Sequence, residues 1–135
     1  MRVVIDTNIF VSSFLGGRPR RVIDLWKRGK IILGLSKDIL EEYVDVLQRL
    51  GLGTEDELVE LLALFKKGIH LVFTAKTPSL AIVKDDPSDN KFIECAVKLE
   101  AECIITGDKA LKAVGDYQGI KILSPHEFLK TFPAA

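Results

Sequence analysis

The sequence predicts an α/β protein with three layers, in which helices cover both faces of a central parallel sheet of about five strands. Short apolar runs alternate with longer segments of helical periodicity along nearly the whole chain, a pattern typical of βαβ units. The runs are apolar throughout rather than alternately apolar and polar, as expected of strands buried on both faces. Neither a linker nor an internal repeat interrupts the 135 residues, so we expect a single domain over residues 1–135.

The first predicted strand is the β-branched run at residues 3–5. Helical segments follow at residues 9–15 and 20–28, and the second of them, RRVIDLWKR, ends at Gly29. The apolar run IILGL at residues 31–35 predicts the next buried strand.

Two helices and a strand are predicted next. Ser36 is a favourable N-cap for the helix SKDILEEYVDVLQRL. Thr54 and Glu57 have the spacing of a capping box for a helix that reaches Lys67. The apolar run IHLVF at residues 69–73 predicts the third strand.

The last part of the chain opens with a predicted loop at residues 75–88, which contain two prolines and an acidic pair. A helix capped by Ser88 or Asp89 follows and extends to Glu100. The remaining predicted elements are strands at residues 103–106 and 120–123, a helix between them at about 108–114, and a final helix that Pro125 opens.

Composition limits the classes of function. Hydrophobic residues make up 47% and charged residues 28%, as in ordinary folded proteins. The 19 basic and 19 acidic residues cancel, so binding to nucleic acid must depend on a local patch. No apolar run approaches the ~20 residues of a membrane span, and the first one is interrupted at Asp6, unlike a signal peptide. We therefore expect a cytoplasmic protein in which Cys95 and Cys103 are reduced core thiols.

Acidic residues fall near the carboxyl ends of the predicted strands, where open parallel sheets bind their ligands. Asp6 ends the first strand, Asp108 follows the fourth strand, and Asp89 begins the helix that leads to it. Glu41 and Glu42 lie in the helix after the second strand, and helical spacing does not choose between them. Each acid taken alone could instead be a helix cap or part of a solvated helix face.

Asp6 is the acid that is hardest to explain as a purely structural residue. A carboxylate at the tip of a buried strand is partly desolvated and needs a partner, and no neighbouring base in the sequence supplies one. Several carboxylates together repel one another unless a cation joins them, and hard divalent ions prefer oxygen ligands. His70 and His126 are isolated, so zinc spacing is absent. The sequence thus predicts a carboxylate site for Mg²⁺ or Mn²⁺, with no lysine or histidine evident as a general acid.

The order of these motifs resembles the PIN-domain family of nucleases. The motifs are VIDTN at the first strand, an acid after the second strand, SDN before a helix, and TGD after the fourth strand. The stretch FVSSFLGGRPRRVIDLWKRGKIILGLSKDILEEYVDVL further resembles a PIN subgroup of toxins from toxin–antitoxin systems, which are VapC-like. The resemblance implies a PIN-like fold and a metal-dependent endoribonuclease that hydrolyses phosphodiester bonds of single-stranded RNA.

The resemblance also implies particular residues and partners. Asp6, Glu42, Asp89 and Asp108 would be the catalytic and metal-binding acids. Asn8 and Thr106 would support them through hydrogen bonds, and Asp86 would be an auxiliary ligand. The implied partners are an RNA substrate, an antitoxin protein and a second copy of the chain in a homodimer.

Two surfaces are candidates for binding these partners. The basic residues Arg18, Arg20 and Arg21 precede or start a helix and could contact RNA phosphates. The helix TEDELVELLALFKK has more apolar residues than one buried face needs, which favours a dimer. The alternative for the basic residues is an ordinary solvated helix start. The alternative for the apolar helix is that its apolar residues all belong to the core.

Other functions remain open at this point. The chain could be an RNA-processing PIN protein that is not a toxin, or a non-catalytic interaction module on the same fold. Phosphatases of the haloacid-dehalogenase type also carry an Asp after the first strand, but they need a second acid two residues later. Asn8 occupies that position here, which counts against this class.

Overall fold

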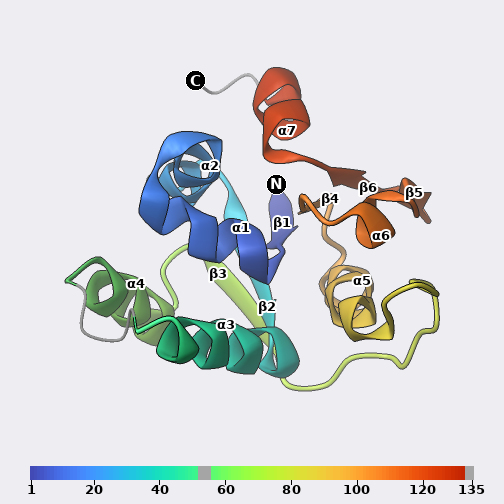
Figure 1. The fold of residues 1–135 in the computed structure, drawn as a ribbon, viewed down its shortest axis with the longest axis horizontal. Coiled ribbons are helices and arrows are strands. Elements are labelled where there is room, and N and C mark those ends of the chain that lie inside the picture. The colour runs from blue at the N-terminus through green and yellow to red at the C-terminus, as the bar shows by residue number, and fades with distance from the viewer. Residues whose placement is uncertain (52–55, 133–135) are drawn as a thin grey trace.

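The computed structural model describes residues 1–51 and 56–132. In this part of the chain, strands form one sheet in the order β3-β2-β1-β4-β6-β5 (Figure 1). All neighbouring strands are parallel except β5, which runs antiparallel to β6. The strands are Arg2–Ile5 (β1), Ile32–Ser36 (β2), Leu71–Thr74 (β3), Cys103–Ile105 (β4), Asp116–Tyr117 (β5) and Ile120–Leu123 (β6). The predicted α/β class with a central parallel sheet is confirmed.

Strand β5 is the one that the sequence did not predict. It forms a hairpin with β6, and the turn between them contains Gln118 and Gly119, both with positive φ. The Asp116 carboxylate accepts the Gly119 N–H at 2.9 Å and closes the turn. A strand of two residues is too short to show a hydrophobic period, which is why the sequence indicated five strands.

Helices cover both sides of the sheet. The helix α5 lies against β1, β2, β3 and β4 on one side, and α2 and α7 contact each other on the opposite side (Figure 1). The α-helices of the described residues are Thr7–Ser12 (α1), Gly17–Lys27 (α2), Lys37–Arg49 (α3), Asp56–Lys67 (α4), Asn90–Leu99 (α5), Lys109–Lys112 (α6) and Pro125–Thr131 (α7). Short 3₁₀ helices lie at Ser13–Leu15 (η1) and Pro87–Asp89 (η2). None of these helices is long and apolar enough to cross a membrane.

Single polar side chains set where several helices begin. The Ser36 hydroxyl accepts the Ile39 N–H at 3.2 Å, as predicted for the N-cap of α3. Asp6 caps α1, so this helix begins two residues before the predicted position. The predicted capping box of α4 involves Thr54, which lies outside the described residues. Ser124 forms an unpredicted capping box with Glu127 at the start of α7.

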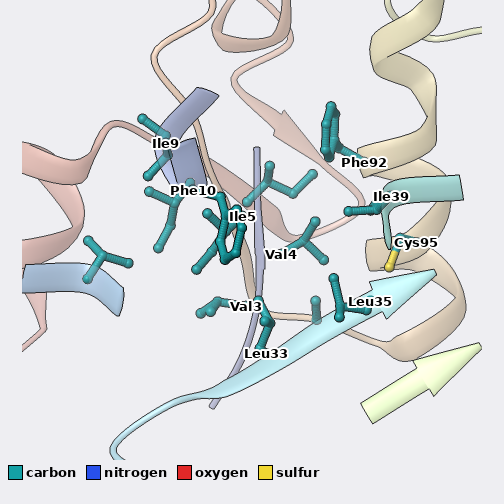
Figure 2. Close-up of a cluster of buried hydrophobic side chains, with 14 of the residues drawn as sticks. Val3, Val4, Ile5, Ile9, Phe10, Leu33, Leu35, Ile39, Phe92 and Cys95 are labelled. Carbon is teal, nitrogen blue, oxygen red and sulfur yellow. The ribbon is translucent and has the colours of Figure 1, made fainter. Parts of the chain in front are cut away.

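The core surrounds β1, the strand that carries Asp6 at its end. Val3, Val4 and Ile5 are completely buried, and Figure 2 shows them between side chains of β2, α1 and α5. On one side, the Phe10 ring stacks on the Tyr43 ring with 4.4 Å between centroids. Both predicted core thiols are buried (Cys95 is drawn in Figure 2), and burial raises the pKa of each to about 12. Packing in the core therefore fixes the end of β1 and the position of the residues that follow it.

The apolar residues of α4 are largely used by the core of the same chain. Leu58 and Leu61 are buried, and Leu64 and Phe65 pack against the core. Val59 and Leu62 are 59% and 39% exposed. The apolar surface that α4 offers to a second copy is therefore smaller than the sequence suggested.

Candidate active site

Asp6 lies at the carboxyl end of β1 and is only 3% exposed. The Asn8 backbone N–H donates to Oδ1 at 2.8 Å, and the Thr106 hydroxyl donates to Oδ2. Burial raises the pKa of Asp6, these two hydrogen bonds oppose the rise, and the charges of Asp108 and Glu42 add to it. The support expected from Asn8 and Thr106 is therefore present, although Asn8 contributes its backbone rather than its side chain.

Thr106 connects two of the predicted acids. Its hydroxyl donates to Asp6 and accepts the Asp108 N–H at 3.0 Å. The Asp108 carboxylate in turn accepts the Ala110 N–H at 2.8 Å and caps α6. Because β1 and β4 are adjacent and parallel, Asp6 and Asp108 reach the same edge of the sheet.

Asp86, Asp89 and Asp108 form the closest group of acids. One carboxylate oxygen from each lies within 4.8 Å of the others. Asp89 is 8% exposed, and its Oδ2 is the one buried side-chain polar atom among the described residues without a hydrogen-bond partner. Asp89 makes no capping hydrogen bond to α5, so the capping alternative weighed for it does not apply in this structure.

The loop before α5 brings Asp86 and Asp89 to this group. Asn90 Oδ1 accepts the backbone N–H groups of Ile82 and Val83 at 2.9 and 2.8 Å. Glu94 accepts the Leu80 N–H at 2.8 Å in the same way. Side chains of α5 thus fix the predicted loop against the helix, and the Asp residues are held at its end.

Electrostatics within the group favour a shared proton. Burial, a hydrogen bond shared with Asp108, and the charges of Asp108, Asp86 and Asp6 together raise the pKa of Asp89 to about 8, and burial is the largest cause. The same hydrogen bond lowers the pKa of Asp108. Near neutral pH, one proton therefore sits between Asp89 and Asp108 when no cation is bound.

Glu42, not Glu41, faces the site. Its Oε2 accepts the Thr7 hydroxyl, and its Oε1 lies 2.7 Å from Lys91 Nζ. Glu41 is exposed and lies 4.0 Å from Lys37, which is one turn earlier on α3. Glu42 is close enough to Asp6 for its charge to raise the pKa of that residue, but it stands outside the group of three acids.

Thr7, Lys91 and Tyr43 are parts of this region that were not predicted from the sequence. The Tyr43 hydroxyl donates to the Ile5 carbonyl and so ties α3 to the end of β1. Lys91 contacts the site through Glu42, and no sequence pattern indicated this contact. It is 49 residues from Glu42, and only the packing of α3 against α5 joins them. A lysine in the first turn of a helix is unfavourable to the helix dipole, and this was the available indication of another role.

The predicted basic residues differ in what they contact. Arg20 donates to the Ser13 carbonyl at 2.6 Å and to the Phe14 carbonyl at 3.1 Å. Arg18 and Arg21 are exposed on α2. Arg20 therefore stabilises the end of η1, and its two neighbours present their charges to solvent.

The donor set fits a hard divalent cation. Three carboxylates converge, the pKa of one of them, Asp89, is raised, and a buried oxygen of Asp89 has no partner. A cation of this type would pair with that oxygen and relieve the mutual repulsion of the acids. The acids that would hold it are Asp86, Asp89 and Asp108, with Asp6 behind them.

A mostly parallel sheet with acids gathered at the carboxyl ends of its central strands defines a nuclease-like domain of the PIN class. The sequence matches the PIN domain family over residues 2–110, and the chain belongs to this family. It is also similar to the uncharacterized protein MJ1680 of Methanocaldococcus jannaschii, with 32% identity over 146 aligned positions. That alignment covers 98% of this chain and 92% of the relative. PIN domains are generally metal-dependent nucleases that bind nucleic acid.

Proposed function

We propose that this protein is an endoribonuclease that uses Mg²⁺ or Mn²⁺ to hydrolyse phosphodiester bonds of single-stranded RNA. The observation that carries the proposal is the unpartnered, buried Oδ2 of Asp89 within a group of three carboxylates. The reaction depends on Asp6, Glu42, Asp89 and Asp108, and Asp86 joins them as a further ligand. Membership of the PIN domain family supports the assignment to nucleases.

The chemistry follows from the roles that these side chains can take. A bound divalent ion supplies positive charge at the phosphoryl oxygens and lowers the pKa of an attacking water. Asp89 and Asp108 hold the ion, and one of these two carboxylates can accept the proton of the water. Asp6 cannot rotate freely, because Thr106 and the Asn8 N–H hold both of its oxygens. It therefore presents a fixed negative charge behind the other acids.

We propose Arg18 and Arg21 as the phosphate contacts of the RNA, because they are exposed. Arg20 was predicted with them, and its hydrogen bonds to Ser13 and Phe14 make it the residue that shapes this segment. Contacts to phosphates carry no sequence information, so these residues would bind different RNAs alike.

The toxin role, an antitoxin partner, a homodimer and a cytoplasmic location belong to the same proposal. They rest on the resemblance of the sequence to the VapC-like subgroup. A gene for a small DNA-binding protein beside this one would support the toxin role. Without such a neighbour, an RNA-processing PIN protein is the better description.

The proposed substrate class can be tested with the purified chain and labelled oligonucleotides. We expect internal cleavage of single-stranded RNA in Mn²⁺, which EDTA stops, and much slower cleavage of duplex RNA and of single-stranded DNA. The variant Glu102→Gln is a matched control, because Glu102 is exposed and immediately precedes β4, at the opposite end of the strand from the acids, and it should cleave at the parental rate. Absence of cleavage would favour the non-catalytic interaction module, and preferred cleavage of DNA would contradict the proposed substrate.

A further inference from the structure

Lys91 makes an ion pair that differs from the other lysine pairs of the described residues near α3 and α5. Its Nζ lies 2.7 Å from Glu42 Oε1, and the two side chains are 22% and 29% exposed. The pair of Lys37 with Glu41 is 4.0 Å long, and both partners are about two thirds exposed. A short, half-buried pair of this kind is held more firmly than an exposed one.

The position of Lys91 in its helix does not explain its presence. Lys91 stands in the first turn of α5, where the positive end of the helix dipole repels a cation. Glu42 supplies the attraction instead, and the Thr7 hydroxyl occupies the other oxygen of Glu42. Both oxygens of Glu42 therefore have partners, in contrast to Asp89 Oδ2.

The acids thus fall into two parts that differ in charge balance. Asp86, Asp89 and Asp108 lie together, and no ion pair to a base is found for them within the described residues. Glu42 has a resident ammonium group at hydrogen-bond distance. A divalent ion at Glu42 would have to displace that ammonium group, whereas an ion at the three Asp residues would displace no basic side chain.

We propose that Lys91 is a positioning residue that takes the place of a second metal ion at Glu42, so that the native site binds a single divalent ion at the three Asp residues. This inference rests on the proposed function, because it assumes that the acids bind a divalent cation. Lys91 holds the Glu42 carboxylate against Thr7 and supplies fixed positive charge beside Glu42. Glu42 therefore contributes to the site through its ion pair with Lys91 and is not a ligand of the divalent ion.

The number of Mn²⁺ ions bound per chain tests the proposal, measured by calorimetry and by loss of the free Mn²⁺ electron paramagnetic resonance signal. The native chain should bind one ion. Lys91→Met keeps an unbranched side chain but removes the charge, so Glu42 is released and the number should rise to two. Lys91→Arg keeps the charge and should bind one ion, as should Lys98→Met, which changes an exposed lysine of the same helix.

The double variant Lys91→Met, Glu42→Gln guards against misfolding of the single variant, because it replaces the ion pair with two uncharged side chains of similar size. It should again bind one ion with the native affinity. Two ions on the native chain, one ion on a folded Lys91→Met variant, or loss of the ion from the double variant would each overturn the proposal. If the native chain binds no ion at all, the proposed function itself fails.

Discussion

Replacing Asp6 with Asn should abolish RNA cleavage and leave the fold intact. The side chain keeps its shape, and an amide oxygen can still accept the Asn8 N–H. The change removes a buried negative charge at the end of β1, where Asp6 contributes to the field of the acidic site. We expect a loss of at least about a thousandfold in rate, equivalent to ~4 kcal/mol of transition-state stabilisation.

The measurement is the initial rate of cleavage of a labelled single-stranded RNA in Mn²⁺, together with a thermal melt of each variant. Glu102→Gln is the matched control, because Glu102 is exposed and immediately precedes β4, at the opposite end of the strand from the acids. This control should keep the parental rate. An Asp6→Asn protein that melts normally and cleaves at the parental rate would refute the assignment of the site.

The affinity for divalent ions should depend steeply on pH, because Asp89 must lose a proton to bind an ion. Burial and the neighbouring acids raise the pKa of Asp89 to about 8, so most of the metal-free protein carries this proton at pH 6 to 7. Below pH 8, the apparent affinity should fall about tenfold for each pH unit as a result. In Asp89→Asn, binding should be weaker and this dependence should disappear.

The same pKa has a predictable effect on the metal-free fold. The folded-state pKa lies above the unfolded value of about 4, so protonated Asp89 stabilises the fold. This stabilisation is complete below about pH 4 and is lost as the pH rises through about 8. Between pH 6 and pH 8.5, the melting temperature of the metal-free parent should therefore fall by more than the melting temperature of metal-free Asp89→Asn.

Calorimetric titration with Mg²⁺ at several pH values, in two buffers of different ionisation enthalpy, measures both affinity and protons released. Close to one proton should leave per ion bound at pH 7. Glu102→Gln should behave as the parent. An affinity that is constant from pH 6 to 8, with no proton released, would show that the ion does not bind at Asp89.

Most of the fold could be predicted because local patterns and global topology agree. Strands that are apolar throughout, such as residues 3–5 and 31–35, bury all of their side chains only when both faces of the sheet are covered. A helix between two successive strands then forms a crossover connection, which joins parallel strands. Strand β5 was missed because its two residues depend on a turn rather than on a hydrophobic period.

The candidate site was predicted less completely. Asp6, Asp89 and Asp108 stand at the ends of elements, and their positions follow from the order of strands. The close grouping of Asp86 with Asp89 depends on how Asn90 and Glu94 fix the preceding loop. No local pattern encodes that geometry.

Lys91 was missed for a related reason. Its partner is on another helix, and such pairs depend on how α3 packs against α5. The contacts of Thr7 with Glu42 and of Tyr43 with Ile5 arise in the same way, from the packing of α3 against the end of β1.

The most direct test of the metal site is the position of Mn²⁺ in crystals of this protein, located by anomalous diffraction near the manganese edge. We predict one strong peak at bonding distance, about 2.0–2.2 Å, from carboxylate oxygens of Asp89 and Asp108, with Asp86 beside it. Asp89 Oδ2, which is buried without a partner in this structure, should be among the ligands. A peak elsewhere on the chain, or none at Mn²⁺ concentrations that support cleavage, would contradict the account.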